Sequence, residues 1–362
     1  MLLKDREMDL VKKSIQILKD GQTADGSFIA CENFGNYRYS WFRDGSYIAS
    51  ALLEYGYTRE AYKFIEWGAM VVNRYQEKME SCILTFQHGG NIAEEDFFHT
   101  RFTLDGYEVP GHWGFNQFDG LGTWLWFTCK VYMRDSQLIP SSDVINALNK
   151  TAEYISIVWP AGCSDCWEEN EGRQHTYTLA SIVAGLREYC NWSENIEYKK
   201  RADSVLKYLK QNCLTSIGYI KSVGLNVSDA NLIGLCEPYN IVAWDDSDFQ
   251  KTLLRIENEL MSPGLHRFLA DTYYGGGEWV LLTAWIGLLY AKHGRIDDAR
   301  KLKTWIESVA TPEGFLAEQV PQHLFAPEKY AQWEKDAGEI ATPLLWSHAM
   351  YLLLVKEIDT RN

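Results

Sequence analysis

The sequence of 362 residues lacks any apolar run long enough to span a membrane. Its start, "MLLKDREMDLVKK", carries charges every few positions and lacks the apolar core of a secretory signal peptide. These absences predict a cytoplasmic protein with no membrane partner. The N-x-[ST] sequons at Asn149, Asn191 and Asn226 are then expected to carry no glycan, because that modification belongs to secretory compartments.

Positive charge is scarce: 35 Lys and Arg face 49 Asp and Glu, which gives a formal net charge of −14. Such a chain is repelled by nucleic acid and by anionic membrane surfaces. We therefore expect no nucleic-acid partner and a neutral substrate. The sequence leaves the oligomeric state unknown.

Cysteine and histidine are not arranged as metal ligands. The 8 cysteines are scattered, and the one C-x-x-C pair, Cys163 and Cys166, has no second pair at zinc spacing. No two histidines stand at i, i+4, so His175 and His348 are expected to be hydrogen-bonded core or pocket-edge groups. We predict reduced thiols, no metal and no cofactor.

Proline and glycine form no linker cluster, and alternating β-branched runs are scarce. We therefore predict a single domain over residues 1–362 and an all-α fold. Apolar residues instead recur at three- and four-residue spacing, the pattern of amphipathic helices. The predicted helices cover residues 8–21, 45–56, 58–75, 121–135, 141–159, 176–190, 195–212, 248–261, 278–294, 296–310 and 342–358, with a short additional helix at 326–336.

Two helix hairpins share one pattern. Residues 56–67 and 294–307 each have a Gly turn, an acidic residue and an Ala at matching offsets, and a Trp 11 residues after the Gly. Very apolar helices such as 278–290 stand beside amphipathic ones such as 297–307. Repeated hairpins of this kind predict a toroid with an inner and an outer ring of helices, and an open solenoid is the alternative.

Polar and aromatic residues gather between the predicted helices. Aromatic faces pack on the apolar C–H faces of a pyranose, and planar polar groups bind adjacent hydroxyls. Loops at one end of a toroid converge, so these stretches predict one sugar pocket. The stretches that mix Trp, Tyr or Phe with Arg, Asp, Glu or Gln are 36–45, 111–122, 166–177, 266–279 and 315–322, with 344–349 close behind.

From about residue 30 to 355 the sequence resembles glycoside hydrolase family 15, the glucoamylases and their relatives. The matching motifs are Y-x-x-x-W-x-R-D (Tyr37, Trp41, Arg43, Asp44), W-G-x-x-Q-x-D-G (Trp113, Gln117, Asp119), W-E-E (Trp167, Glu168, Glu169), R-x-x-x-D-T-Y-Y (Arg267, Asp271, Tyr273) and E-Q followed by W-S-H-A (Glu318, Gln319, Trp346). The resemblance implies an (α/α)6 barrel. It also implies exo-acting hydrolysis that inverts the anomeric carbon and releases β-glucose from the non-reducing end of an α-glucoside.

The resemblance implies a role for each matched residue. Glu168 matches the general acid, and Glu318 matches the general base, assisted by Tyr37 and Gln319. Glu169 matches a carboxylate that holds hydroxyls around the leaving group. The remaining matches are the glucose-gripping residues Arg43, Asp44 and Arg267, the aromatic walls Trp41, Trp113 and Trp167, and the further substrate-binding residues Gln117, Tyr273 and Trp346.

Inverting chemistry needs one protonated and one ionised carboxyl, roughly 6.5–9.5 Å apart, so that a water fits against the anomeric carbon. The neighbouring Glu169 and the aromatic walls both favour a raised pKa for Glu168, which would keep this acid protonated near neutrality. Glu318 stands far along the chain, as expected for a base on the opposite side of a closed ring.

The sequence departs from the family in two respects. Segment 320–342 is longer than the usual connection, and "GGGEW" at 275–279 places the chain nearer the prokaryotic branch. With no N-terminal β-sandwich or starch-binding domain recognisable, we expect short α-1,4- or α-1,6-glucosides as substrates, and trehalose third. The alternatives are a non-catalytic glucan-binding regulatory protein and an unrelated toroid enzyme, such as a lyase or an isomerase.

Overall fold

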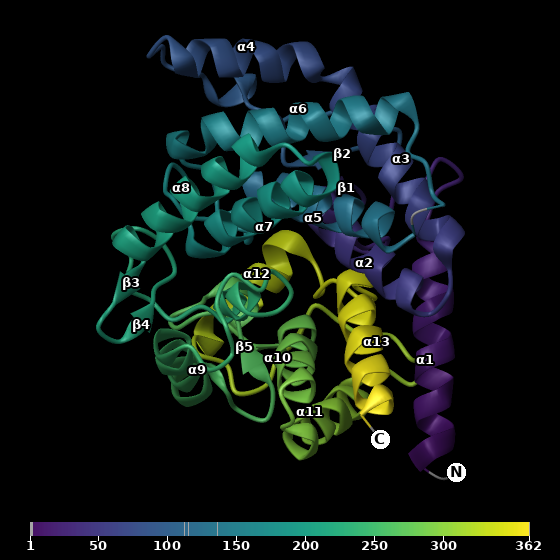
Figure 1. Cartoon of the computed structure of the whole chain (residues 1–362). Helices are drawn as coiled ribbons and strands as arrows, with labels where there is room; N and C mark the ends of the chain where they lie inside the picture. Colours follow the sequence, from purple (N-terminus) through teal and green to yellow (C-terminus); the bar gives the residue numbers. More distant parts are fainter. Residues whose placement is uncertain (1–2, 112, 115, 136, 362) are drawn as a thin grey trace.

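The computed structural model describes residues 3–111, 113–114, 116–135 and 137–361, which are mainly helical (Figure 1). The predicted helices are all present, with ends shifted by a few residues. The α-helices are α1 (Leu3–Asp20), α2 (Phe42–Glu54), α3 (Thr58–Arg74), α4 (Gln76–Gln87), α5 (Phe118–Arg134), α6 (Ser142–Val158), α7 (Thr176–Ser193), α8 (Ile196–Asn212), α9 (Ser247–Leu260), α10 (Val280–Lys292), α11 (Ile296–Val309), α12 (Pro327–Ala337) and α13 (Leu345–Thr360).

The inner ring consists of α2, α5, α7, α10, α13 and the short 3-10 helix η4 (Ala230–Leu235). Within the described residues, each of these packs on the next, and α13 returns to α2, so the ring closes. The outer ring consists of α1, α3, α6, α8, α9 and α11. This closed arrangement is the predicted (α/α)6 barrel and excludes the open solenoid.

The two rings differ in sequence because they differ in environment. In α10, every residue from Val280 to Ala291 is buried, as an apolar surface all round the helix requires. In α9, the buried residues recur at three- and four-residue spacing, which is one face of an outer helix. The contact between α5 and α7 depends on Gly122 and Gly185, since a Cβ at Gly185 would lie 2.6 Å from the Gly122 carbonyl.

Two features were not predicted from the sequence. Helix α4 follows α3 directly through Tyr75 and buries only Met79, Cys82 and Ile83, so its apolar pattern is weak. The fourth inner element, η4, is too short to give a periodic signal. It begins at the Asp229 cap, and its chain soon reaches Pro238, which cannot continue a helix.

Short β ladders position the loops at the N-terminal ends of the inner helices. β1 (Ser40–Trp41) pairs with β2 (Arg101–Phe102), and β3 (Leu214–Thr215) pairs with β4 (Gly218–Tyr219). β5 (Leu265–His266), β6 (Glu278–Trp279) and β7 (Gln319–Val320) form one antiparallel sheet. This sheet brings the segment that carries Arg267 and Tyr273 next to the distant segment that carries Glu318.

No helix in the described part of the chain is both long and apolar enough to cross a membrane.

Candidate active site

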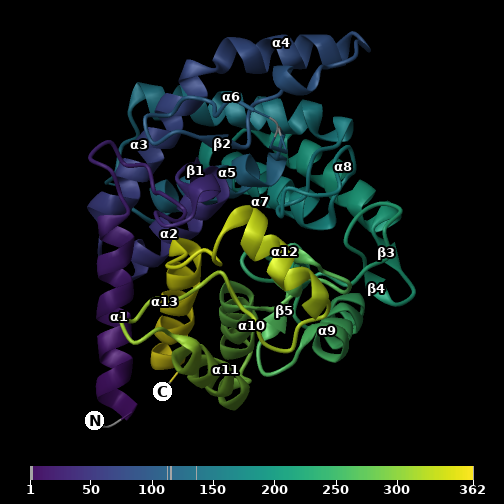
Figure 2. The same ribbon diagram turned by 180° about the vertical axis from the view of Figure 1, so that it is seen from behind.

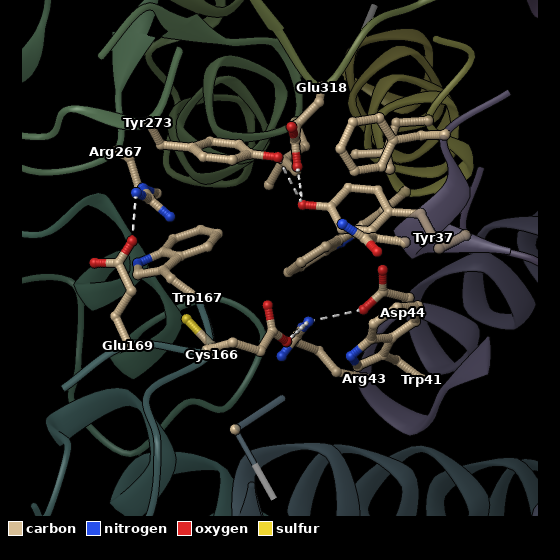
Figure 3. Close-up of a pocket in the computed structure, with 18 of the residues that line it drawn as sticks. Tyr37, Trp41, Arg43, Asp44, Cys166, Trp167, Glu169, Arg267, Tyr273 and Glu318 are labelled. Atoms are coloured by element: carbon tan, nitrogen blue, oxygen red, sulfur yellow. Dashed lines mark hydrogen bonds and ion pairs between the residues drawn. The ribbon is translucent and has the colours of Figure 1, made fainter. Parts of the chain in front are cut away.

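The loops and first turns at the N-terminal ends of the inner helices surround a cavity of about 360 Å³ (Figure 3). Helix N-termini carry partial positive charge, so this end of the ring favours anionic groups. All the predicted site residues except Gln117 and Gln319 line the cavity. Those that do are Tyr37, Trp41, Arg43, Asp44, Trp113, Trp167, Glu168, Glu169, Arg267, Tyr273, Glu318 and Trp346.

Gln117 and Gln319 are not among the residues that line this cavity; they lie behind residues that do. The Gln117 side chain donates to Glu168 Oε1 at 3.0 Å and accepts from Arg43 at 3.1 Å. The Gln319 side chain donates to the Tyr273 carbonyl at 3.2 Å and accepts from the Gly277 N–H at 3.0 Å. Each side chain thus contacts a residue of the lining, Glu168 for Gln117 and Tyr273 for Gln319, and the substrate-binding role expected for both stays a prediction.

Glu168 sits in a turn with left-handed backbone, φ 60°, which costs energy for any residue other than glycine. Asp165 organises this turn. Its carboxylate accepts the N–H groups of Trp167 at 3.0 Å and Glu169 at 2.9 Å, and its carbonyl accepts the N–H of Glu168 at 3.0 Å. These hydrogen bonds hold the strained conformation that turns Glu168 toward the cavity.

A buried lysine supports the same turn from behind. Lys221 lies 3.0 Å from Asp165 and also pairs with Asp229, and all three side chains are at most 2% exposed. Asp229 in turn accepts the indole N–H of Trp167 at 3.0 Å. Lys221 was not predicted as part of the site, because Asp165 lies in another loop and no local pattern marks the lysine.

The Glu168 carboxyl is enclosed by other charged groups. Arg43 lies 3.5 Å from it and 3.1–3.2 Å from Asp44 and Asp119, both of which are buried. Burial raises the pKa of Glu168 to about 7; Arg43 opposes the shift, and Asp44 and Asp119 add to it. Asp44 and Asp119 are thus the carboxylates that add most to the effect of burial.

Glu318 reaches the cavity from the residue before β7. The Tyr37 hydroxyl donates to Glu318 Oε1 at 3.0 Å and lies 3.1 Å from the Tyr273 hydroxyl. The other oxygen, Oε2, is buried and has no hydrogen-bond partner among the described residues. Burial raises the pKa of Glu318 to about 8, although the Tyr37 hydrogen bond opposes the shift.

Arg267 anchors the side of the cavity away from Arg43 (Figure 3). It lies 2.8 Å from Glu169 and 2.7 Å from Asp271. The lining also contains Trp279 and Trp333, which the sequence analysis did not assign to the site. Trp279 could have been predicted from the sequence, because it is the last residue of the segment 266–279 that carries Arg267 and Tyr273.

The residues outside this constellation have other partners. His175 bonds to Ser222 and to the Cys163 carbonyl, and His348 bonds to Ser14 and to the Leu316 N–H, so both are buried, hydrogen-bonded groups as predicted. All 8 cysteines lie in the described residues and are free thiols. Among those residues no group of three or more His, Cys, Asp or Glu side chains could hold a metal.

The family model for glycosyl hydrolases family 15 matches residues 5–356. The chain belongs to this family. It is therefore a glycoside hydrolase, and the resemblance seen in its motifs is confirmed over nearly the whole length.

Individual members of family 15 show the same relationship. The chain is 31% identical to an isomaltose glucohydrolase from Kribbella flavida, over 97% of this chain and 92% of that enzyme. It is 23% identical to trehalase 1 of Sulfolobus acidocaldarius, where the match covers 89% of this chain but only 56% of that protein. A glycosidase variant solved in complex with glucose superposes with a TM-score of 0.92 at 30% identity, over 98% of this chain and 97% of that one.

Proposed function

We propose that this family 15 enzyme is an exo-acting, inverting α-glucosidase that releases β-glucose from the non-reducing end of short α-glucosides. The observation that carries the proposal is the pair Glu168 and Glu318, two carboxyls in one cavity, both with raised pKa values. Glu318 is buried, and the Glu168 side chain is 16% exposed. Isomaltose, the α-1,6-linked disaccharide, is the first candidate substrate. The relative from Kribbella flavida, which is matched over 92% of its length, is named for the hydrolysis of isomaltose.

Glu168 is the proposed general acid, which protonates the leaving oxygen. Glu318 is the proposed general base. Its Oε2 has no partner among the described side chains, so this oxygen is free to accept a hydrogen bond from the attacking water. Burial raises the pKa of both carboxyls. A water that donates to Oε2 lowers the pKa of Glu318, because hydrogen bonding favours the charged form, and the proposed roles depend on this bond.

Arg43 and Asp44 are proposed to grip the hydroxyls of the terminal glucose, at the end of the cavity bounded by Trp41 and Trp346. The indole N–H groups of both tryptophans are buried without a hydrogen-bond partner in the described chain, and sugar hydroxyls could accept from them. A cavity of about 360 Å³ lies at the small end of the usual ligand-pocket range, which supports a short substrate over a polymer.

Two alternatives to this function are a trehalase and a non-catalytic glucan-binding protein. A trehalase is supported by the match to trehalase 1, which is weaker than the isomaltose glucohydrolase match in identity and in coverage of the partner. A non-catalytic glucan-binding protein would have no need of two carboxyls with raised pKa values that line one cavity. We further propose one catalytic domain over residues 1–362 and a cytoplasmic location, which 8 free thiols favour.

The proposal is tested by proton NMR of fresh reactions with isomaltose, maltose, trehalose and soluble starch. The expected result is β-glucose before mutarotation, and the highest kcat/KM on isomaltose or maltose. Release of α-glucose would indicate a retaining double displacement, which needs carboxyls only about 5–5.5 Å apart. If starch exceeded every disaccharide by about tenfold, a difference of about 1.4 kcal/mol in transition-state binding, the small-substrate proposal would fail.

The pH dependence follows from burial of the two carboxyls. The active form of the enzyme has one of the two carboxyls, Glu168 and Glu318, protonated and the other ionised. The two groups interact, so their apparent pKa values belong to the pair. Because the pKa values are raised to about 7 for Glu168 and about 8 for Glu318, we expect a bell-shaped kcat/KM profile with its maximum near neutral pH. Initial rates from acid to alkaline pH provide the measurement. A maximum near pH 4, about the ordinary range of exposed carboxyls, would contradict it.

A further inference from the structure

Segment 320–342, whose role the sequence left open, is an excursion that starts and ends beside Glu318. The N–H of Glu318 donates to the carbonyl of Ala341 at 2.9 Å, which closes the base of the excursion. Its helix α12 has no buried residue, and both ribbon views place it over the middle of the ring (Figures 1 and 2). Core burial therefore does not account for this helix, and 11 residues alone form only a marginal helix in water.

Contacts at both ends and along its length hold α12 to one turn, residues 273–276. Before the helix, the Ala326 N–H donates to the Gly275 carbonyl at 2.9 Å. After it, the Gly338 carbonyl accepts from the Tyr274 hydroxyl at 2.7 Å. Between them, the rings of Trp333 and Tyr273 lie edge to face with centroids 4.9 Å apart, and Trp333 stacks on Tyr274 at 6.0 Å. The helix is thus fixed in place above Tyr273.

One face of α12 belongs to the cavity. Trp333 and Ala337 both line it, and they lie four residues apart, so they are neighbours on the same helix face. A half-buried aromatic ring beside a very small side chain leaves space along the ring. That combination suits a flat sugar, which packs its C–H face on an aromatic surface.

The position of Trp333 relative to the reacting groups decides which sugar it meets. Its neighbour Tyr273 lies 5.4 Å from the Arg267 guanidinium, measured to the ring centroid, and Arg267 binds Glu169 at 2.8 Å. Figure 3 shows Tyr273, Arg267 and Glu169 on the side of the cavity opposite Arg43 and Asp44. With the terminal glucose at Arg43 and Asp44, Trp333 faces the side where the leaving group departs.

We propose that Trp333 is the platform for the leaving sugar, and that it determines the preference for α-glucosides whose leaving group is itself a sugar. Ala337 provides the room for that second ring. This inference rests on the proposed function. Trp333 takes no part in the chemical step. In that step the bond from C1 to the leaving oxygen breaks, Glu168 gives a proton to that oxygen, and water adds to C1 and gives a proton to Glu318.

The test compares two substrates that share the glucosyl group and differ in the leaving group. Isomaltose leaves a glucose, whereas α-glucosyl fluoride leaves a fluoride ion, which needs no aromatic platform. We expect W333A to lower kcat/KM for isomaltose by about tenfold or more, as loss of a buried aromatic anchor does, and to change the value for the fluoride little. W333F should recover part of the loss.

The matched controls lie on the same helix. Tyr330 contacts Tyr274, with centroids 6.2 Å apart, but does not line the cavity, so Y330A should leave both substrates unaffected. A337F should block isomaltose and spare the fluoride, because a large side chain fills the space for the second ring.

Three results would overturn either the platform role of Trp333 or the proposed function. Equal losses on both substrates in W333A would mean that Trp333 only supports Tyr273. No loss on isomaltose would exclude a platform at this position. A wild-type enzyme inactive on α-glucosyl fluoride and on every disaccharide would overturn the proposed function itself.

Discussion

Replacing Glu168 or Glu318 with Gln is expected to lower kcat on isomaltose by about 10²–10⁴-fold, the usual contribution of a general acid or base. The exchange keeps the size of the side chain and removes only its ability to carry or take the proton. KM should change little, because the carboxyls act in the transition state. Initial rates of glucose release measure the effect.

Exposed glutamates of the same loops provide the controls. Glu171 follows Glu168 and lines the cavity, yet it is exposed, and Glu313 precedes Glu318 on the surface. E171Q and E313Q should both retain activity near that of the wild type. If E313Q lost activity and E318Q kept it, the assignment of the base would be wrong.

The two carboxyls can be distinguished from each other by the leaving group. Fluoride departs without protonation, so E168Q should keep far more activity on α-glucosyl fluoride than on isomaltose. E318Q should lose activity on both substrates, because each needs an activated water. The double variant should be much less than multiplicatively impaired, since both groups act on one transition state. Equal losses for E168Q on the two substrates would contradict its role as the acid.

Replacing Lys221 with Met is expected to cost about 3–5 kcal/mol of the free energy of unfolding, because it leaves buried carboxylates without their cation. Burial alone would raise the pKa of Asp165, yet Lys221, with His175 and hydrogen bonds, holds it below its ordinary value. Without the lysine, Asp165 and Asp229 have higher pKa values in the folded state. The loss should therefore be greatest at alkaline pH and shrink as the pH falls and these carboxyls take up protons.

Denaturant unfolding at several pH values measures this effect. Lys251 pairs with Asp248 at 2.7 Å on the surface, with 48% of the lysine side chain exposed, so K251M is a matched control expected to cost at most about 1 kcal/mol. The double variant K221M/D229N removes one orphaned charge and should recover part of the stability lost in K221M. A loss in K221M that equals the control and does not vary with pH would exclude this role for Lys221.

Much of the fold could be predicted from local sequence. The periodicity of α9 and the uniform apolarity of α10 each depend on residues within one helix, so the pattern can be read without tertiary contacts. The two elements that were not predicted, α4 and η4, are those whose apolar periodicity is weak. One buries three residues, and the other is six residues long.

The candidate site was predictable where residue types and spacing carry the chemistry. The glutamates, the arginines and most aromatic walls stand in recognisable motifs, and the structure brings those residues to one cavity. Gln117 and Gln319 stand in the same motifs but lie behind the lining, since a motif specifies residue types and not the direction in which each side chain points.

The sequence by itself determined most of the helical segments, that the helices form hairpins, and which residue types meet between them, because these depend on periodicity and spacing along the chain. Only the tertiary structure decided that Asp44 and Asp119 surround Glu168, that Lys221 supports its turn, and that α12 places Trp333 on the cavity. Burial and electrostatic interactions depend on distance in space. The partners of these residues come from loops far apart in the chain, so no local pattern records them.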